Sequence, residues 1–381
     1  MIDDLDFMPP LRFDEEYTSP AVIKVIGIGG AGGNAVNRMI EAKIKGVEFI
    51  VANTDAQALL KSRALQKLQI GSSITKGLGA GGNPERGRLA AEEDRASLKK
   101  ALEGSDMVFI TAGMGGGTGT GGCPVVSEIV HEIGAMSVAV VTKPFRFERK
   151  RRHIQAEQGI SELRELVDTI LIIPNDKLFS VVNEGTTFDD ALRLADDVLM
   201  QAVKGISEVV TLPGLINVDF ADVKTIMSER GGSAIMGLGC ATGDGRATRA
   251  VQQAIRSPLL EGVNLRGARG ILLNITGGRD ITKDEIEEIT SEIESIADEE
   301  ANLIFGVVIK DKVDEISVTV IATGFPEEEM IFEESITKIE NYEKVSEVNS
   351  DVKIQRQLKK EEKDILIIPT FMRKEKGLSA E

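Results

Sequence analysis

Three glycine-rich stretches, at residues 27–33, 79–82 and 113–122, constrain the fold of this chain more than any other feature of its sequence. The first and third follow short apolar runs, and a helix-like pattern comes after each stretch. Glycine lets the backbone approach an anion closely, and the first turn of a helix offers free N–H groups to it. The stretches therefore predict loops at the carboxyl ends of parallel strands, which together form one crevice lined with backbone donors.

The pattern around these stretches alternates between strand and helix. Strands are expected over 21–28, 48–52, 107–111, 137–142 and 169–173, and helices over 84–102, 124–133 and 151–166. Strands that are apolar throughout are typical of a parallel sheet covered on both faces. The fold class is therefore α/β, with a Rossmann-like parallel sheet in the first half of the chain.

A long central helix is expected over 188–210, before a second and smaller α/β domain. Four strands (233–241, 270–275, 303–309 and 316–322) and two helices (246–256 and 282–297) are expected in that domain. Only residues 310–315 separate the last two strands, so we expect those strands to pair as a hairpin.

A chain of 381 residues is longer than one hydrophobic core of ordinary size can accommodate, which favours two folded domains with linkers. Six parts are expected: a disordered acidic segment (1–20), a nucleotide-binding domain (21–186), the central helix with the start of the next loop (187–216), the second domain (217–325), a charged flexible linker (326–363) and a terminal peptide (364–381). The apolar peptide Asp364–Lys374 follows a charged linker, which favours a docking role for partner proteins over packing as an edge strand.

The composition excludes several classes of protein. A net charge of -16, no Trp and 2 Tyr argue against nucleic-acid binding, and 2 Cys with 2 His argue against a disulfide scaffold and most zinc sites. No apolar run reaches the roughly 18 residues of a membrane span, and the first residues are acidic where a secretory leader is basic. We expect a cytosolic protein that does not insert into the membrane.

The first glycine stretch fits G-x-G-x-x-G at Gly27, Gly29 and Gly32, and the next strand ends at Asn53-Thr54-Asp55, where a ribose-binding acid could lie. A nicotinamide dehydrogenase is therefore one interpretation. Three glycine loops offer more backbone N–H groups than the pyrophosphate of a dinucleotide needs, and they suit a nucleoside triphosphate. The sequence contains no G-x-x-x-x-G-K-[ST], so a Walker-type loop is excluded.

The heptapeptide Gly-Gly-Gly-Thr-Gly-Thr-Gly at Gly115–Gly121 is highly specific. With the flanking strands, it resembles the FtsZ family of bacterial, tubulin-like cell-division GTPases, and the resemblance extends over residues 21–325 and the tail peptide Asp364–Lys374. It implies a GTP-binding domain, a long central helix, a second α/β domain, and head-to-tail polymerisation into protofilaments that scaffold the division ring at mid-cell. The tail would bind membrane-tethering and division-regulating proteins.

The resemblance also assigns the residues that would bind GTP or GDP. The phosphate loops would contribute Gly30, Ala31, Gly32, Gly33, Asn34, Gly81, Gly82, Gly115, Gly116, Gly117, Thr118 and Gly119, and the ribose loop Glu148 and Arg152. Asn175 and Asp196 would read the guanine, since a carboxylate can accept from both its N1–H and its exocyclic amine. Two positions depart from the family pattern: Leu192 replaces a Phe that stacks on the base, and Arg149 replaces a Gly.

A candidate catalytic group lies outside these loops, at Asn217, Asp219 and Asp222. By itself, either carboxylate could simply cap the following helix. By resemblance they form a loop that reaches the γ-phosphate of the next subunit, so that hydrolysis needs assembly. No cluster of metal ligands is evident, and Mg²⁺ would be held mainly by the phosphates. A nucleotide-bound filament with negligible turnover is the remaining alternative.

Overall fold

The computed structural model describes residues 21–178, 187–212, 214–228, 232–260, 265–311 and 313–325. The expectations for residues 1–20, 326–363 and 364–381 lie outside the described residues. None of the described helices is long and apolar enough to cross a bilayer.

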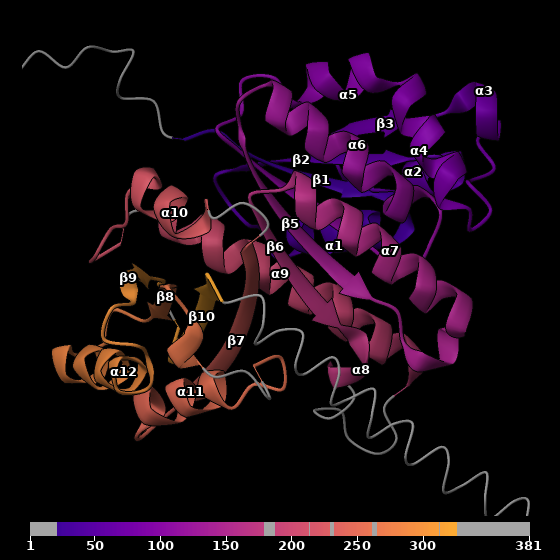
Figure 1. The fold of residues 1–381 in the computed structure, drawn as a ribbon. Helices are drawn as coiled ribbons and strands as arrows, with labels where there is room; N and C mark the ends of the chain where they lie inside the picture. The colour runs from indigo at the N-terminus through magenta and orange to yellow at the C-terminus, as the bar shows by residue number, and fades with distance from the viewer. Residues whose placement is uncertain are drawn as a thin grey trace, which may run out of the picture. The chain divides into compact units, whose positions relative to one another are not determined.

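One ten-stranded sheet, in the order β3-β2-β1-β4-β5-β6-β7-β10-β8-β9, forms the framework (Figure 1). The first six of these strands are all parallel: β1 (Ile23–Ile28), β2 (Val47–Asn53), β3 (Gln66–Gln69), β4 (Met107–Gly113), β5 (Met136–Lys143) and β6 (Thr169–Pro174). Their carboxyl ends therefore share one edge, as the glycine loops require.

Helices cover both faces of these parallel strands. One apolar core joins the sheet to α1 (Gly29–Glu41), α2 (Ala56–Lys61) and α9 (Phe188–Thr211), and a second core joins the opposite face to α5 (Arg95–Leu102), α6 (Thr118–Glu132) and α7 (Lys150–Leu166). The short helices α3 (Ser72–Thr75), α4 (Pro84–Glu93) and α8 (Asn175–Leu178) lie in the connections. This arrangement confirms the expected parallel α/β layers.

The last four strands are β7 (Gly232–Thr242), β8 (Gly270–Gly277), β9 (Asn302–Ile309) and β10 (Glu315–Thr323). The expected hairpin of the last two strands is wrong: β10 lies between β7 and β8 and is antiparallel to both, while β9 pairs in parallel with β8. A central place gives the apolar β10 backbone partners on both edges and buries Ile316, Val318 and Val320 beneath α11 (Arg246–Ile255) and α12 (Lys283–Ile296).

Helix α9 packs against both parts of the sheet. Its residues Leu199, Val203 and Ile206 share a core with residues of β5 and β6 and with Met236 and Ile321 of β7 and β10. Full burial of such a side chain contributes about 1.5–3 kcal/mol, so a continuous stripe of them fixes the helix firmly. The direct link between β6 and β7 is short, from Thr169–Leu171 to Gly232–Ala234.

Two helices begin or end elsewhere than the sequence pattern indicates. The amphipathic run 84–102 is two helices, α4 and α5, because Asp94 leaves helical geometry and its carboxylate accepts a hydrogen bond from the Gly71 amide at 2.7 Å. Helix α6 begins at Thr118, six residues before the expected start, so part of the third glycine stretch is helical. Its small residues let α6 approach α4 closely.

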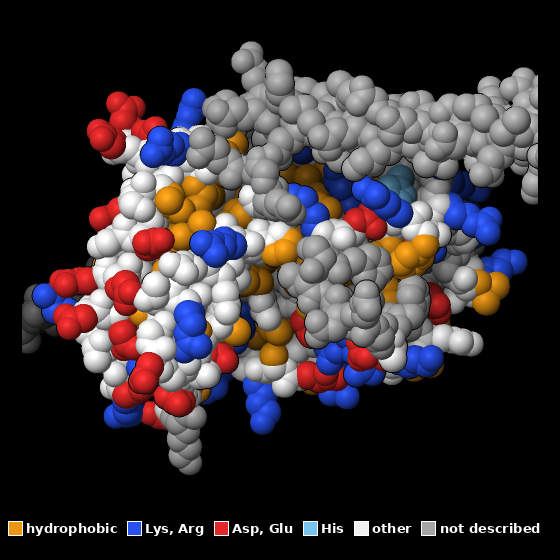
Figure 2. Space-filling view, turned by 90° about the horizontal axis from the view of Figure 1, so that it is seen from below, with side chains coloured by type: hydrophobic (Ala, Val, Ile, Leu, Met, Phe, Trp, Pro, Cys, Tyr) orange, Lys and Arg blue, Asp and Glu red, His pale blue; other side chains and the backbone are white. Residues whose placement is uncertain are grey.

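On the face shown in Figure 2, the hydrophobic side chains that reach the surface lie in small groups among charged ones. The contacts of α12 join it to α11. Acidic residues are frequent in α12, whose amino end has a capping box between Thr282 and Glu285. The buried Arg246 guanidinium, within hydrogen-bond distance of Glu285 at 2.8 Å, holds the pKa of that carboxyl below its usual range. These contacts tie α11 to α12.

We predict that Gly121→Ala destabilises the fold by about 2–3 kcal/mol, the cost of overpacking. A Cβ on Gly121 would lie 1.9 Å from the Pro84 carbonyl oxygen of α4, so the backbone must shift. A Cβ on Gly30, which is also helical, meets nothing within 4 Å, and Gly30→Ala is the matched control. Urea unfolding of the two variants measures the difference, and equal stability would contradict this packing.

Candidate nucleotide-binding site

The three predicted glycine loops meet at the carboxyl edge of the parallel strands. A Cβ built on Gly29 would lie 3.0 Å from the Gly119 amide nitrogen, and one on Gly117 would lie 2.8 Å from the Ala80 Cβ. The first loop thus touches the third, and the third touches the second. Gly30, Ala31 and Asn34 at the start of α1 are exposed, as are Gly81 and Gly82.

Two helix amino ends at this edge carry no side-chain cap. The first turns of α1 and α6 have neither a capping hydrogen bond from a side chain nor an acidic residue. Some other helices are capped by a side chain, for example α4 by the Asn83 carboxamide, which accepts from the Glu85 amide at 3.0 Å, while α3, α5, α7 and α11 also have no side-chain cap. Unbonded N–H groups together with the helix dipole favour a negatively charged ligand such as phosphate.

The predicted ribose-loop residues lie beside the third glycine loop. A Cβ on Gly115 would lie 2.6 Å from the Arg152 carbonyl oxygen, so α7 begins against this loop. Arg152 forms an ion pair with Glu148, whose carboxylate also accepts from the Phe145 amide at 3.0 Å. Both candidate ribose contacts are therefore already held in position.

Arg149 has a strained backbone, with φ 76° and ψ 156°. This region is essentially restricted to glycine, and a side chain there costs about 1–3 kcal/mol. The strain explains why a glycine would be easier to accommodate at this position. The exposed guanidinium adds positive charge beside the loop.

Asn175 begins α8, directly after β6, and is only 7% exposed. Its side-chain Oδ1 atom is buried without a hydrogen-bond partner among the described residues. Leaving such an atom unpaired costs about 1–3 kcal/mol, so an orphaned acceptor at the carboxyl end of a parallel strand fits a residue that awaits a ligand donor. The ribose loop lies next to it, because the Arg146 amide donates to Asp176 at 3.0 Å.

Asp196 lies on α9 and is half-buried. Burial raises the pKa of its carboxyl to about 7; Arg38 of α1 opposes the rise and Asp197 adds to it. Arg38 forms an ion pair with Asp197 at 3.6 Å, which connects this part of α9 to the helix of the first glycine loop. Leu192, which is 40% exposed, lies one turn before Asp196 on the same helix.

Sequence patterns did not identify the contact between Thr54 and Thr118, whose buried hydroxyl oxygens lie 2.7 Å apart. It joins the end of β2 to the start of α6. The neighbouring Asp55 was a candidate ribose-binding acid, but its carboxylate accepts from the amides of Gln57 and Ala58 and caps α2. This capping role accounts for Asp55 without a dinucleotide and disfavours the dehydrogenase interpretation.

Asn217, Asp219 and Asp222 lie away from the glycine loops. They follow the carboxyl end of α9, where Thr211 packs on Gly46. Gly46 directly precedes β2, so this end of α9 lies at the amino end of a strand. The glycine loops, in contrast, follow the carboxyl ends of the strands. Asp219 accepts from the Asp222 amide at 2.8 Å and caps α10 (Phe220–Met227). Capping uses one carboxylate oxygen, and all three side chains are exposed.

Within the described part of the chain, no three His, Cys, Asp or Glu side chains are grouped to hold a metal ion. The positions predicted to bind the nucleotide are thus uncapped amides, polar side chains and one ion pair.

Comparison with known proteins places this chain in a family. The model of the Tubulin/FtsZ family GTPase domain matches residues 22–183, and that of the FtsZ family C-terminal domain matches residues 232–326. The chain is 56% identical over 310 residues to the cell division protein FtsZ of Wigglesworthia glossinidia brevipalpis, covering 81% of this chain and 80% of that protein. It is 50% identical to the FtsZ of Buchnera aphidicola subsp. Acyrthosiphon pisum (strain APS), covering 94% and 98%.

A solved structure of an empty FtsZ dimer from M. jannaschii superposes with a TM-score of 0.77 at 44% identity, covering 81% of this chain and 90% of that one. The fold and the matched domains together define a tubulin-like GTPase. Within that class, the chain belongs to the FtsZ family of cell-division proteins.

The raised pKa of Asp196 predicts a pH-dependent stability. Its pKa is about 7 in the folded protein against an ordinary value of 3.8, so the folded state binds this proton more tightly and its stability falls as pH rises from 4 to 7. Above pH 7 the buried charge is fully present. We expect Asp196→Asn without nucleotide to be more stable than wild type at pH 8, by on the order of 1–2 kcal/mol after allowance for partial exposure.

Urea unfolding at several pH values measures this difference, which should vanish toward pH 4. A stability difference that stays constant across the range would contradict the assignment. Asp189→Asn is the control variant, because Asp189 is an exposed carboxylate of the same helix and does not contribute to the raised pKa of Asp196.

Proposed function

We propose that this chain is a GTPase that polymerises head to tail and hydrolyses GTP at the junction between subunits. The observation that carries the proposal is the separation of the glycine loops from Asp219. Helix α9 has 24 residues and rises 1.5 Å per residue, which gives roughly 36 Å between its ends. Groups at opposite ends of the strands can act on one phosphate only if two subunits stack, a contact that propagates into an open filament.

Guanine recognition rests on Asn175 and Asp196. The unpaired Oδ1 of Asn175 is an acceptor, and an ionised Asp196 can accept from the N1–H and the exocyclic amine of guanine together. Adenine offers no such pair of donors. Leu192 covers the base with less π contact than a Phe would give, and Arg149 adds a positive charge beside the ribose loop.

The glycine loops hold the phosphates through backbone amides: the first through Gly30–Asn34, the second through Gly81-Gly82 and the third through Gly115–Gly119. Glu148 and Arg152 contact the ribose. Mg²⁺ is held mainly by phosphate oxygens, where it neutralises charge. Asp219 and Asp222 of the neighbouring subunit orient the attacking water, Asn217 helps to position it, and the products are GDP and phosphate.

The loop that carries these acids is built to meet another protein surface. Leu215 is 65% exposed and Ile216 is 37% exposed, next to Asn217, whose side chain accepts from the Gly214 amide at 2.7 Å. Exposed apolar groups beside polar ones mark interaction sites. The dimer described for the M. jannaschii relative supports self-association, and the names of the relatives support a role in cell division. The filaments would act in a cytoplasmic ring at the division site.

Light scattering and phosphate release, measured in one sample with GTP, ATP or GDP, test the proposal. We expect GTP alone to produce both polymer and phosphate, with a specific activity that rises steeply with protein concentration. Turnover with a constant specific activity below the polymerisation threshold would overturn the split site. Polymer without phosphate release would favour the nucleotide-bound structural filament.

Asp219→Ala should bind GTP normally and slow hydrolysis by about 10²-fold or more, because a group that orients water is lost. A partner variant, Gly116→Asp, should reject nucleotide by charge repulsion, and a Cβ on Gly116 meets nothing within 4 Å. Mixing the two variants should restore part of the turnover, since an intact Asp219 then faces GTP bound by the other subunit. Gly116→Ala is the neutral control, and a mixture as inactive as its parts would contradict the shared site.

The peptide Asp364–Lys374 docks on membrane-tethering and division-regulating proteins, with Ile368 and Phe371 as apolar anchors and Arg373 and Lys374 as steering charges. This proposal rests on the sequence of the tail, which lies outside the described residues. Deletion of residues 364–381 should leave GTP hydrolysis within about twofold and abolish recruitment to membrane-bound partners in pull-down assays. Loss of hydrolysis would show that the tail belongs to the folded body.

A further inference from the structure

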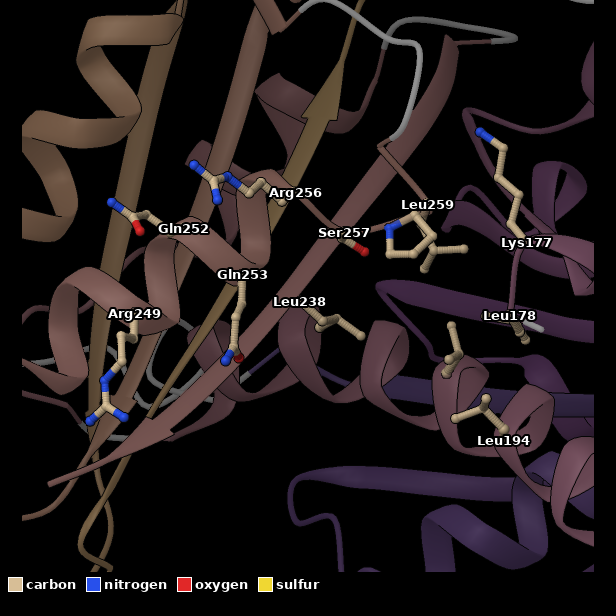
Figure 3. A pocket seen from close by; sticks show the side chains of 12 residues that line it. Lys177, Leu178, Leu194, Leu238, Arg249, Gln252, Gln253, Arg256, Ser257 and Leu259 are labelled. Atoms are coloured by element: carbon tan, nitrogen blue, oxygen red, sulfur yellow. The ribbon is translucent and has the colours of Figure 1, made fainter. Parts of the chain in front are cut away.

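A cavity of about 520 Å³ lies between α8 and α9 on one side and β7, α11 and the segment after α11 on the other (Figure 3). None of the described residues that line it belongs to the glycine loops or to the loop of Asp219. Its size falls in the range of about 300–1,000 Å³ that small-molecule sites occupy. The cavity is therefore large enough for a ligand; it shares no lining residue with the proposed nucleotide site, although α8 and α9 also carry Asn175 and Asp196.

Leucine and valine side chains from both sides form an apolar wall. Leu194 and Val198 are one helical turn apart on α9, and they share the cavity with Leu178, Leu238 and Leu259. Figure 3 shows Leu178 and Leu194 on one side, Leu238 near the centre, and the polar chains of α11 on the other side. This wall would bury the hydrocarbon part of a ligand.

The charged groups that the described residues contribute to the cavity are all positive. Lys177, Arg249 and Arg256 line it, and none of the described lining residues is acidic. This excess contrasts with the whole chain, which has 61 acidic residues against 45 Lys and Arg. Charge complementarity therefore selects an anion.

Four long polar side chains line the cavity from α11 and the residue after it, and two of them are engaged. Arg249 donates to the carbonyl oxygens of Thr242 and Asp244, and Gln253 accepts from the Cys240 amide at 3.1 Å. The Arg256 guanidinium and the Gln252 carboxamide have no hydrogen-bond or ion-pair partner within the described ranges. These two groups remain available to hold the head of a ligand.

We propose that this cavity binds a small amphipathic anion, such as a medium-chain carboxylate. The carboxylate accepts hydrogen bonds from Arg256 and Gln252, and the hydrocarbon chain lies along Leu194, Val198 and Leu238. Neither the residues nor the ligand chemistry depends on the nucleotide site, so this inference stands independently of the proposed GTPase mechanism.

Isothermal titration with decanoate, below its micelle concentration, is the direct test. We expect saturable binding of one decanoate per chain, while decanol, without the charge, should bind at least about tenfold more weakly. Decyltrimethylammonium, which has the opposite charge, should not compete with decanoate. Absence of saturable decanoate binding, or equal binding of the cationic amphiphile, would overturn the proposal.

Two variants locate the site. Arg256→Ala should weaken decanoate binding about tenfold by removing a charged hydrogen bond, and Leu194→Gln should weaken it by a similar factor through the apolar wall. Arg279→Ala, an exposed arginine on the loop after β8, is the matched control and should change affinity less than about twofold. Thermal unfolding confirms that each variant is folded, and a folded Arg256→Ala with wild-type affinity would overturn the assignment.

Discussion

The apolar stripe of α9 is the interaction on which the rest of the structure depends. Val198, Leu199, Ala202, Val203 and Ile206 are nearly inaccessible to solvent, and they contact side chains from strands on both sides of the β6–β7 pair. At about 1.5–3 kcal/mol for each large residue, this stripe contributes more stability than any single ion pair among the described residues. Even the buried ion pair between Glu208 and Lys310, at 2.8 Å, adds little net stability, because desolvation of the two charges offsets much of their Coulomb attraction.

Much of the fold could be predicted from the sequence, because burial dictates the pattern of apolar residues. β5 and β6 read as continuous apolar runs, and the structure buries them between two helical layers. The hairpin of β9 and β10 could not be excluded in this way, because strand order in a sheet depends on tertiary packing that local spacing does not encode. The start of α6 was missed for a related reason: glycine and threonine are poor helix formers, and only packing against α4 makes a helix of them.

The candidate site could be predicted where its chemistry resides in the backbone. Glycine stretches after strands indicate phosphate loops by themselves, and the structure brings the three stretches together. Side-chain roles are harder to derive, because the Asp219 carboxylate that caps α10 looks the same in sequence whether or not it also orients water. The orphaned Oδ1 of Asn175 and the raised pKa of Asp196 depend on burial and become visible only in three dimensions.

The narrow link between β6 and β7 has a mechanical consequence. A sheet resists bending through its ladder of hydrogen bonds, and this ladder shrinks to the short segments Thr169–Leu171 and Gly232–Ala234. At this short β6–β7 pairing, the stiffness of the sheet comes mainly from α9, which packs against both parts of the sheet through non-directional apolar contacts. A bending force on the sheet would therefore concentrate its strain along the line between β6 and β7, and the two parts of the sheet would bend relative to each other there.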